Sequence, residues 1–299
     1  MKIAYIITAY KLPDLLVRLV QRLNTDETSF FIHVDKKTDS DIYQRMLEPF
    51  HAYTNVHFIE RIVCNWGEFG QVRAPLNGIH AVLADDIKYD YAFSLTAQDY
   101  PIKSNRQIQE VLQNCAGRSF LNYLTFPHPE AEQKADWIAY WHIHMRRWSF
   151  VFPRRNMFPI HFLNRLWNPL VPRITLRRSI PGGLQPFFGG SHWCLSRDCL
   201  QYLQEFVQQN PAYGKFFSKY VHIPSEIFFQ TILLNSPLKD RLVNDDLSYI
   251  DFSGKKNAHP AVLDKGDFEK FMRTGDLFAR KFDPTIDGEV LDMIDAAIR

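Results

Sequence analysis

Apolar positions follow two periods along the chain and divide it into strands and helices. Near-continuous apolar runs at residues 3–10, 29–35, 55–59 and 91–96 predict strands that are buried on both faces. A helix is predicted after the first strand, with one apolar face made of Leu15, Leu16, Leu19, Val20 and Leu23. A second helix is predicted over residues 72–83. This βαβ opening predicts an α/β fold whose central sheet has helices on both faces.

The second half of the chain alternates less regularly. A glycine turn leads into a strand over residues 187–196, and a helix is predicted over 198–208. Another helix is predicted from Ser225. The remaining predicted elements are short extended pieces at 242–243 and 249–252, a helical unit at 264–275 and an extended segment at 277–283.

One carboxylate stands at the start of the helix predicted from Ser225. The Ser225 hydroxyl can cap this helix, which places Glu226 in its first turn. The helix dipole favours a charged carboxyl there, and a general base at neutral pH needs that form. Glu226 is therefore the candidate catalytic base. The alternative is that Glu226 only complements the dipole, as acidic residues at helix starts often do.

The composition is that of an ordinary folded protein. Hydrophobic residues make up 46% of the 299 residues and the formal net charge is +2, which argues against disorder. Four cysteines without CxxC spacing indicate neither a zinc site nor a disulfide framework. The N-terminal apolar run is too short for a signal peptide, and no other run approaches the roughly 20 residues of a membrane span. We expect a cytoplasmic location, with peripheral contact at the inner face of the cell membrane as an open alternative.

Residues 141–180 contain no acidic residue, three tryptophans and four phenylalanines. The segment also carries eight arginines, namely Arg146, Arg147, Arg154, Arg155, Arg165, Arg173, Arg177 and Arg178. Cationic and aromatic side chains together suit anionic lipid headgroups or an anionic acceptor. The alternative is a solvated region whose arginines pair with acidic residues elsewhere. Nucleic acid is not an expected partner, because neither the net charge nor any binding motif supports it.

Two adjacent cations, Arg280 and Lys281, interrupt an otherwise apolar extended segment. A diphosphate would suit them, since arginine grips phosphate oxygens with a planar fork and lysine acts as a point charge. The pair could then neutralise a departing nucleotide without a metal. The alternative is surface ion pairing with Asp283 or Asp276.

Polar residues also follow two of the predicted strands. His33 and Asp35 end the second strand, and Asp99 falls just past the fourth. Ligands of open α/β sheets bind beyond the carboxyl ends of the strands, so His33 and Asp35 are candidates for contact with a nucleotide base or ribose. An acidic residue at a strand end is equally ordinary turn chemistry.

No metal or phosphate-loop motif is evident. Asp39 and Asp41 have Asp-x-Asp spacing, but they more simply cap a helix that begins near Ile42, and residues 244–246 need convergent partners to bind a metal. We therefore predict no metal cofactor. Neither GxGxxG nor GxxxxGK[ST] occurs, and no GxSxG elbow marks a serine hydrolase.

Taken together, these residues make the chain resemble the core-2/I-branching β-1,6-N-acetylglucosaminyltransferase and peptide O-xylosyltransferase family. The resemblance covers most of the chain and is closer to the xylosyltransferase branch around Asp99 and Glu226. It rests on six stretches in the same order: His33-Val34-Asp35-Lys36, Trp66-Gly67, Ala97-Gln98-Asp99-Tyr100-Pro101-Ile102, Gly190-Ser191-His192-Trp193, Pro224-Ser225-Glu226-Ile227-Phe228-Phe229 through Asn235-Ser236-Pro237, and Phe278-Ala279-Arg280-Lys281-Phe282.

The resemblance implies an A-type glycosyltransferase fold, with a mixed central sheet of Rossmann-like character. It also implies a UDP-sugar donor, inversion by single displacement and no metal. The family's base maps to Glu226, and the diphosphate would be held by Arg280 and Lys281. Asp35 would meet the uracil or ribose. The donor or acceptor pocket would be lined by Trp66, Asp99, His192 and Trp193.

The chain departs from the family pattern in three places. Animal members carry a membrane anchor and disulfides, which this sequence does not show, so a bacterial cytoplasmic enzyme of surface polysaccharide synthesis fits better. His192 stands where xylosyltransferases carry an acidic residue, so the sugar can be N-acetylglucosamine or xylose. Residues 141–180 have no counterpart and are assigned to acceptor choice or membrane docking.

We thus expect a single glycosyltransferase domain over residues 1–299. Residues 1–105 would form its nucleotide-binding part, and residues 106–299 its acceptor-binding and catalytic part, with an insertion at 141–180. Its partners would be a UDP-sugar and a glycan or lipid-linked glycan acceptor. Two rival hypotheses remain: a non-catalytic glycan- or membrane-binding protein with the same fold, and a transferase that does use a metal.

Overall fold

The computed structural model describes most of the chain. The described residues are 1–115, 117–125, 128–145, 148–152, 161–171, 179–252 and 260–299. A seven-stranded sheet lies at the centre, in the order β10-β6-β9-β4-β1-β2-β3. Its strands are β1 (Ile3–Ala9), β2 (Thr28–Val34), β3 (Val56–Phe58), β4 (Tyr91–Thr96), β6 (Ser119–Leu121), β9 (Trp193–Ser196) and β10 (Leu242–Val243). Strands β1 to β4 are parallel and β9 is antiparallel to β4 and β6, so the predicted mixed sheet is confirmed.

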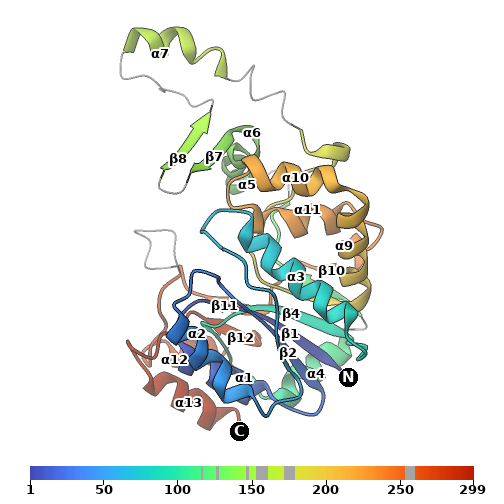
Figure 1. Ribbon diagram of the computed structural model, residues 1–299, viewed down its shortest axis with the longest axis vertical. Helices are drawn as coiled ribbons and strands as arrows, with labels where there is room; N and C mark the ends of the chain where they lie inside the picture. Colours follow the sequence, from blue (N-terminus) through green and yellow to red (C-terminus); the bar gives the residue numbers. More distant parts are fainter. Residues whose placement is uncertain (116, 126–127, 146–147, 153–160, 172–178, 253–259) are drawn as a thin grey trace.

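Helices cover both faces of this sheet (Figure 1). The helices within the described residues are α1 (Pro13–Leu23), α2 (Ser40–Leu47), α3 (Gly70–Ala84), α4 (Asn105–Asn114), α5 (Pro129–Lys134), α6 (Asp136–Ala139), α7 (His161–Trp167), α9 (Arg197–Gln209), α10 (Pro211–Tyr220), α11 (Phe228–Leu234), α12 (Phe268–Met272) and α13 (Glu289–Ala297). Single 3₁₀ turns are formed by η1 (Glu48–Phe50), η2 (Pro181–Gly183), η3 (Pro224–Glu226) and η4 (Lys239–Arg241).

The pleat of β1 divides the apolar core into two parts. Tyr5 and Ile7 point to one face of the sheet, where they pack with residues of α1, α4 and α13. Ala4 and Ile6 point to the other face, where α3, α9, α10 and α11 cover the sheet. Burial on both faces explains why these strands read as continuous apolar runs.

Two smaller sheets complete the fold. Strands β11 (Ser248–Ile250), β12 (Phe278–Arg280) and β5 (Asp99–Pro101) form one of them, with β12 antiparallel to β5. Strands β7 (Trp141–Met145) and β8 (Trp148–Phe152) form a hairpin that leads to α7. Strand β7 packs beside α6 and α10, whereas Figure 1 shows α7 away from the main body. Of the eight arginines in residues 141–180, only Arg165 lies within the described residues. No helix in the described part of the chain is long and apolar enough to span a bilayer.

The predicted elements are largely confirmed, with one correction that concerns the candidate base. The Asp39 side chain caps α2 by accepting a hydrogen bond from the backbone N–H of Asp41, as predicted. The helix predicted from Ser225 is instead split into η3 and α11 at Ile227, whose φ of −134° is not helical. Ser225 caps neither piece.

Candidate active site

Strand ends from different parts of the chain meet at one edge of the central sheet. Parallel strands β2 and β4 flank β1, so Asp35 after β2 and Asp99 after β4 emerge at the same edge. Because β9 runs antiparallel to β4, its first end, preceded by His192, lies there too. This is the edge at which ligands bind in open α/β sheets.

Asp99 is the most buried charged residue of this edge, with 1% of its side chain exposed. Its Oδ2 accepts a hydrogen bond from the backbone N–H of Thr96 at 2.5 Å and lies 3.1 Å from His192 Nε2. Its Oδ1 lies 2.8 Å from Arg280 Nε, an ion pair between directly opposite residues of β5 and β12. Asp99 therefore contacts the end of β4, the residue that precedes β9 and the end of β12.

The charge state of Asp99 follows from these contacts. Burial alone would raise the pKa of its carboxyl, but His192, Arg280 and the Thr96 N–H lower that pKa to about 2. Asp99 is thus ionised at neutral pH and fixes the Arg280 guanidinium. Arg280 pairs with this buried carboxylate rather than with Asp283 or Asp276, the partners considered from sequence.

Lys281 lies in a second, more positive environment. Burial and the nearby charges of Arg280 and Lys11 lower the pKa of its ammonium group. Lys11 follows β1 and contacts Asp283 at 3.5 Å. Lys11, Arg280 and Lys281 form what we term the cation cluster. Three cations that repel one another at a strand edge are arranged to receive an anion. Sequence reasoning identified Arg280 and Lys281 but not Lys11, which carries no motif.

Glu226 ends the η3 turn, just before α11. Its side chain is 30% exposed, and its Oε2 lies 3.0 Å from Lys134 Nζ, which also contacts Glu130 Oε1 at 2.9 Å. Burial raises the pKa of Glu226, whereas the Lys134 charge acts in the opposite direction and Glu130 raises it again. The net pKa shift is upward, with burial as its largest cause. The helical first turn on which the dipole argument rested is not formed, because Glu226 precedes the break at Ile227.

The backbone around Glu226 is fixed by the glycine turn. The Gly189 N–H donates to the Glu226 carbonyl at 2.8 Å, and Gln230 Nε2 donates to the Gly190 carbonyl. A Cβ on Gly189 would lie 1.9 Å from the Asn122 carbonyl oxygen, so only glycine fits there. This turn leads directly to His192, and through it to Asp99. Glu226 and the Asp99 ion pair therefore belong to one connected site.

Trp66 and Gly67 contact the segment that precedes the η3 turn. The Ile223 N–H donates to the Gly67 carbonyl at 3.1 Å, and the Trp66 ring meets the edge of the His222 ring at 5.6 Å. The Trp66 side chain is 62% exposed. A large exposed aromatic surface of this kind suits an apolar face of a bound sugar.

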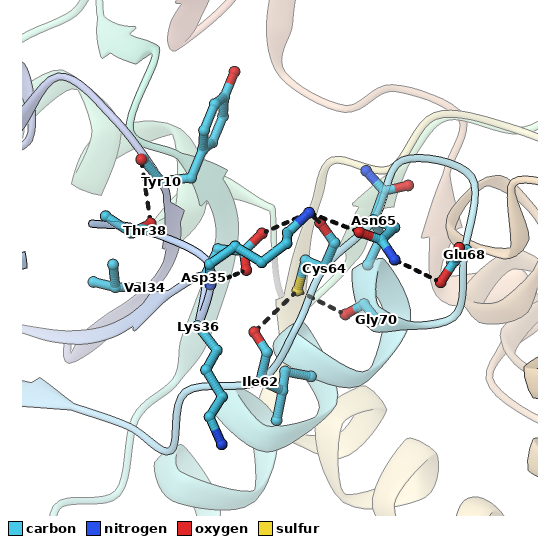
Figure 2. A network of polar contacts seen from close by, with 12 residues as sticks. Tyr10, Val34, Asp35, Lys36, Thr38, Ile62, Cys64, Asn65, Glu68 and Gly70 are labelled. Carbon is cyan, nitrogen blue, oxygen red and sulfur yellow. Dashed lines mark hydrogen bonds and ion pairs between the residues drawn. The ribbon is translucent and has the colours of Figure 1, made fainter. Parts of the chain in front are cut away.

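The end of β2 joins this region through polar contacts (Figure 2). Asp35 Oδ1 accepts from the Lys37 N–H at 2.9 Å, while Lys37 Nζ donates to Asn65 Oδ1 and to the Cys64 carbonyl. Asn65 precedes Trp66 in the chain. Asp35 is therefore linked by a short series of contacts to the Trp66 side of the site.

Two other predicted site residues are placed in the interior. His33 is 1% exposed, and its Nε2 accepts a hydrogen bond from the Ile62 N–H at 3.1 Å, which ties β2 to the following loop. Burial lowers the pKa of His33, consistent with a neutral ring in this role. Trp193 is 1% exposed and packs against Phe229 with ring centroids 5.8 Å apart. Both side chains are therefore part of the core that packs beneath this edge of the sheet.

The acidic stretch at residues 244–246 also reaches the site. Asn244 Oδ1 accepts from the Tyr123 N–H and Asp245 Oδ1 from the Leu247 N–H. Burial raises the pKa of Asp246, and the nearby His192 charge lowers it. Within the described residues, no group of three or more His, Cys, Asp or Glu side chains is placed to hold a metal ion.

The contacts above unite all six stretches that carry the resemblance, and comparison with known proteins agrees with it. The model of the Core-2/I-Branching enzyme family matches residues 3–272. The chain belongs to this family. The matched residues include the ends of β2 and β4, the start of β9 and the η3 turn, whereas Arg280 and Lys281 lie beyond them.

Curated proteins similar to this chain include xylosyltransferases. Xylosyltransferase 2 of Rattus norvegicus is 27% identical over 315 residues, covering 98% of this chain and 33% of that protein. Xylosyltransferase 1 of Homo sapiens is 26% identical over 301 residues, covering 94% and 28%. The chain thus spans about a third of the length of the curated relatives it matches.

Likeness to solved structures is low. The 4-diphosphocytidyl-2C-methyl-D-erythritol synthase from Anaerococcus prevotii aligns with a TM-score of 0.33 and 10% identity, over 71% of this chain and 75% of that chain. A likeness at this level says nothing about the activity of this chain.

Proposed function

We propose that the protein transfers a sugar from a UDP-sugar to a hydroxyl group of a glycan, with inversion at the anomeric carbon and without a metal. N-acetylglucosamine and xylose are the favoured sugars, and bacterial surface polysaccharide synthesis is the favoured setting. One observation carries the proposal: a partly exposed carboxylate, Glu226, is connected through the 189–192 turn and Asp99 to the cation cluster. A base and an anion site at one strand edge suit single displacement from a nucleotide donor.

The proposed reaction moves one proton and exchanges one bond. Glu226 accepts the proton of the acceptor hydroxyl while that oxygen bonds to the anomeric carbon. The bond from this carbon to the UDP oxygen breaks on the opposite face, and its electron pair leaves with UDP. The raised pKa of Glu226 suits a base, because it brings the carboxylate closer to the proton affinity that transfer needs.

The cation cluster would stabilise the diphosphate as it leaves. Asp99 neutralises part of the Arg280 charge and orients its guanidinium, and Asp283 neutralises part of the Lys11 charge. Three cations beside two carboxylates leave a net positive charge for the diphosphate. Such preorganised charge can contribute several kcal/mol to the transition state, as removal of single stabilising donors costs about 3 kcal/mol in other enzymes.

A pH profile tests the pairing of Glu226 with Lys134. In Lys134→Met, the acidic limb of kcat/KM should move upward by about 1 pH unit or more, because an opposite charge within ion-pair distance lowers a carboxyl pKa by that order. Activity at low pH then falls, since Glu226 stays protonated to higher pH. Glu130→Gln should move the same limb downward, because the Glu130 charge raises the pKa of Glu226. Equal or same-direction shifts in the two variants would contradict the assignment.

Donor binding tests the cation cluster. Lys11→Ala/Lys281→Ala should weaken UDP binding in isothermal titration calorimetry by about tenfold or more, given that charge-assisted hydrogen bonds contribute about 1.5–3 kcal/mol each. The matched control is Lys88→Ala/Lys215→Ala, which removes two exposed lysines elsewhere. The titration is done with chelator present. Unchanged affinity in the first variant, or equal loss in the control, would refute the anion site.

A thermal-shift screen tests the donor class. UDP, UDP-sugars and other nucleotides are added in chelator, and a ligand that binds only the folded state raises the melting temperature. We expect stabilisation by UDP compounds above all. Stabilisation only after addition of a divalent metal would replace the metal-free mechanism, and no shift with any nucleotide would favour a non-catalytic glycan-binding protein.

A further inference from the structure

Helix α7 exposes its apolar side and buries a polar one. Phe162 is 67% exposed, Leu166 59% and Leu163 39%, whereas Asn164 is only 8% exposed. At 100° per residue, the three apolar residues fall within one 100° sector, and Asn164 points to the opposite side. A surface helix of a water-soluble protein normally has the reverse arrangement. The apolar side of α7 is therefore built to meet an apolar medium.

The same exposure continues on the segments beside α7. Leu170 is 43% exposed after the helix, and Phe152 of β8 and Ile143 of β7 are 38% and 40% exposed. Phe152 also contacts the Trp167 ring at 5.7 Å, which ties α7 to the hairpin. We call β7, β8, α7 and Leu170 the arm. Figure 1 shows α7 and the end of β8 beyond the rest of the molecule, so this apolar surface stands clear of the main body.

The charge of residues 141–180 indicates which apolar medium the arm meets. Arg165 is exposed on α7, and residues 141–180 contain eight arginines and no acidic residue in the sequence. Since the whole chain has a formal net charge of only +2, the rest of the chain is net negative. Apolar side chains flanked by arginines, without acidic residues, match the boundary between acyl chains and phosphate headgroups.

We infer that the arm docks on an anionic lipid bilayer, with Phe162, Leu163 and Leu166 inserted at the headgroup boundary and Arg165 against lipid phosphates. A second copy of the chain is a poorer occupant, because two arms of the same positive charge repel one another. Insertion and charge supply the two signals that stable peripheral binding requires.

The root of the arm lies beside the candidate active site. Trp141 of β7 contacts Tyr220 at 4.4 Å, and His142 stacks on His222 at 4.9 Å. His222 also contacts Trp66 and lies four residues before Glu226 in the sequence. On the proposed function, a docked arm holds the acceptor side of the site near the bilayer, which selects an acceptor carried on a lipid. The docking itself does not depend on that function.

Co-sedimentation with vesicles tests the docking. The intact protein is mixed, without substrates, with phosphatidylcholine vesicles or with vesicles containing about 30% phosphatidylglycerol, an anionic surface of the kind found on inner leaflets. We expect binding to the anionic vesicles and much less to the neutral ones. Phe162→Ser/Leu166→Ser should reduce binding about tenfold or more, since each lost apolar side chain removes buried surface. The matched control is Ile87→Ser/Ile286→Ser, which changes two other exposed apolar residues.

The outcomes are distinct. Equal binding to neutral and anionic vesicles, or equal loss in the control variant, would overturn the inference. So would a stable dimer, seen by light scattering, that Phe162→Ser/Leu166→Ser converts to monomers, because the arm would then be a self-association surface. Melting temperatures of both variants should match the parent protein, since the changed residues are exposed. UDP binding to Phe162→Ser/Leu166→Ser is measured separately by thermal shift. If UDP still stabilises this variant while vesicle binding is unaffected by the substitutions, the docking inference fails and the proposed function stands.

Discussion

Glu226→Gln is expected to lower turnover by roughly 100-fold or more while leaving UDP affinity unchanged, on the scale of lost general-base catalysis. The amide has the shape of the carboxyl but cannot accept the proton of the acceptor hydroxyl. The local fold should persist, because the glycine turn is held by the backbone carbonyl of Glu226 and by Gln230, which the substitution leaves in place. Turnover is measured by UDP release, and affinity by calorimetry.

Glu130→Gln is the matched control for this variant. It removes the other carboxylate that contacts Lys134, but Glu130 is half-exposed and has no proposed role in proton transfer. Its turnover near neutral pH should stay within a few-fold of the parent value. Normal turnover in Glu226→Gln would remove the proposed base. Equal losses in both variants would show that the carboxylates act on the structure around Lys134 and not on the acceptor.

Asp99→Ala should cost about 3–5 kcal/mol of folding free energy, because removal of one partner leaves a buried charge uncompensated. Arg280 is the charge concerned, with 19% of its side chain exposed, and His192 loses its contact as well. Urea unfolding measures the loss. The calorimetric affinity for UDP should fall too, since the Arg280 guanidinium is no longer oriented.

A surface ion pair provides the comparison. Asp198 contacts Arg241 at 2.7 Å, with side chains 54% and 42% exposed, so Asp198→Ala should cost about 1 kcal/mol or less. Equal losses of folding free energy in Asp99→Ala and Asp198→Ala would contradict the account of Asp99. The pH dependence gives a second check. Because the Asp99 pKa is lowered from 3.8 to about 2, its stabilisation is present above about pH 4 and lost as pH falls toward 2.

Apolar periodicity predicted the central sheet well because burial on both faces leaves a direct pattern in the sequence. The run at 91–96 coincides with β4, and the runs at 3–10 and 29–35 differ from β1 and β2 by a residue at the ends. Short strands buried against other segments leave no such pattern. Strand β5 has three residues, and β6 has three, and neither was predicted.

Long-range contacts explain what the sequence did not reveal about the site. Lys134 lies 92 residues from Glu226, on a short helix without a motif, and only the fold brings their side chains together. The break at Ile227 is likewise invisible in the local pattern, which favours one continuous helix up to the buried Phe228 and Phe229 and beyond. Arg280 was predicted as a surface or phosphate-binding cation, whereas its buried partner Asp99 depends on the pairing of β5 with β12.

Nuclear magnetic resonance of the transfer reaction tests the central claim most directly. The protein is incubated in chelator with UDP-N-acetylglucosamine or UDP-xylose and with the glycolipid fraction of its source cells, and the anomeric proton of the sugar is followed. The account predicts loss of the α-linked donor signal, release of UDP and a new β-anomeric signal in the product, all absent in Glu226→Gln. An α-linked product would contradict single displacement. No consumption of either donor, with or without added divalent metal, would contradict the assignment of a UDP-sugar transferase.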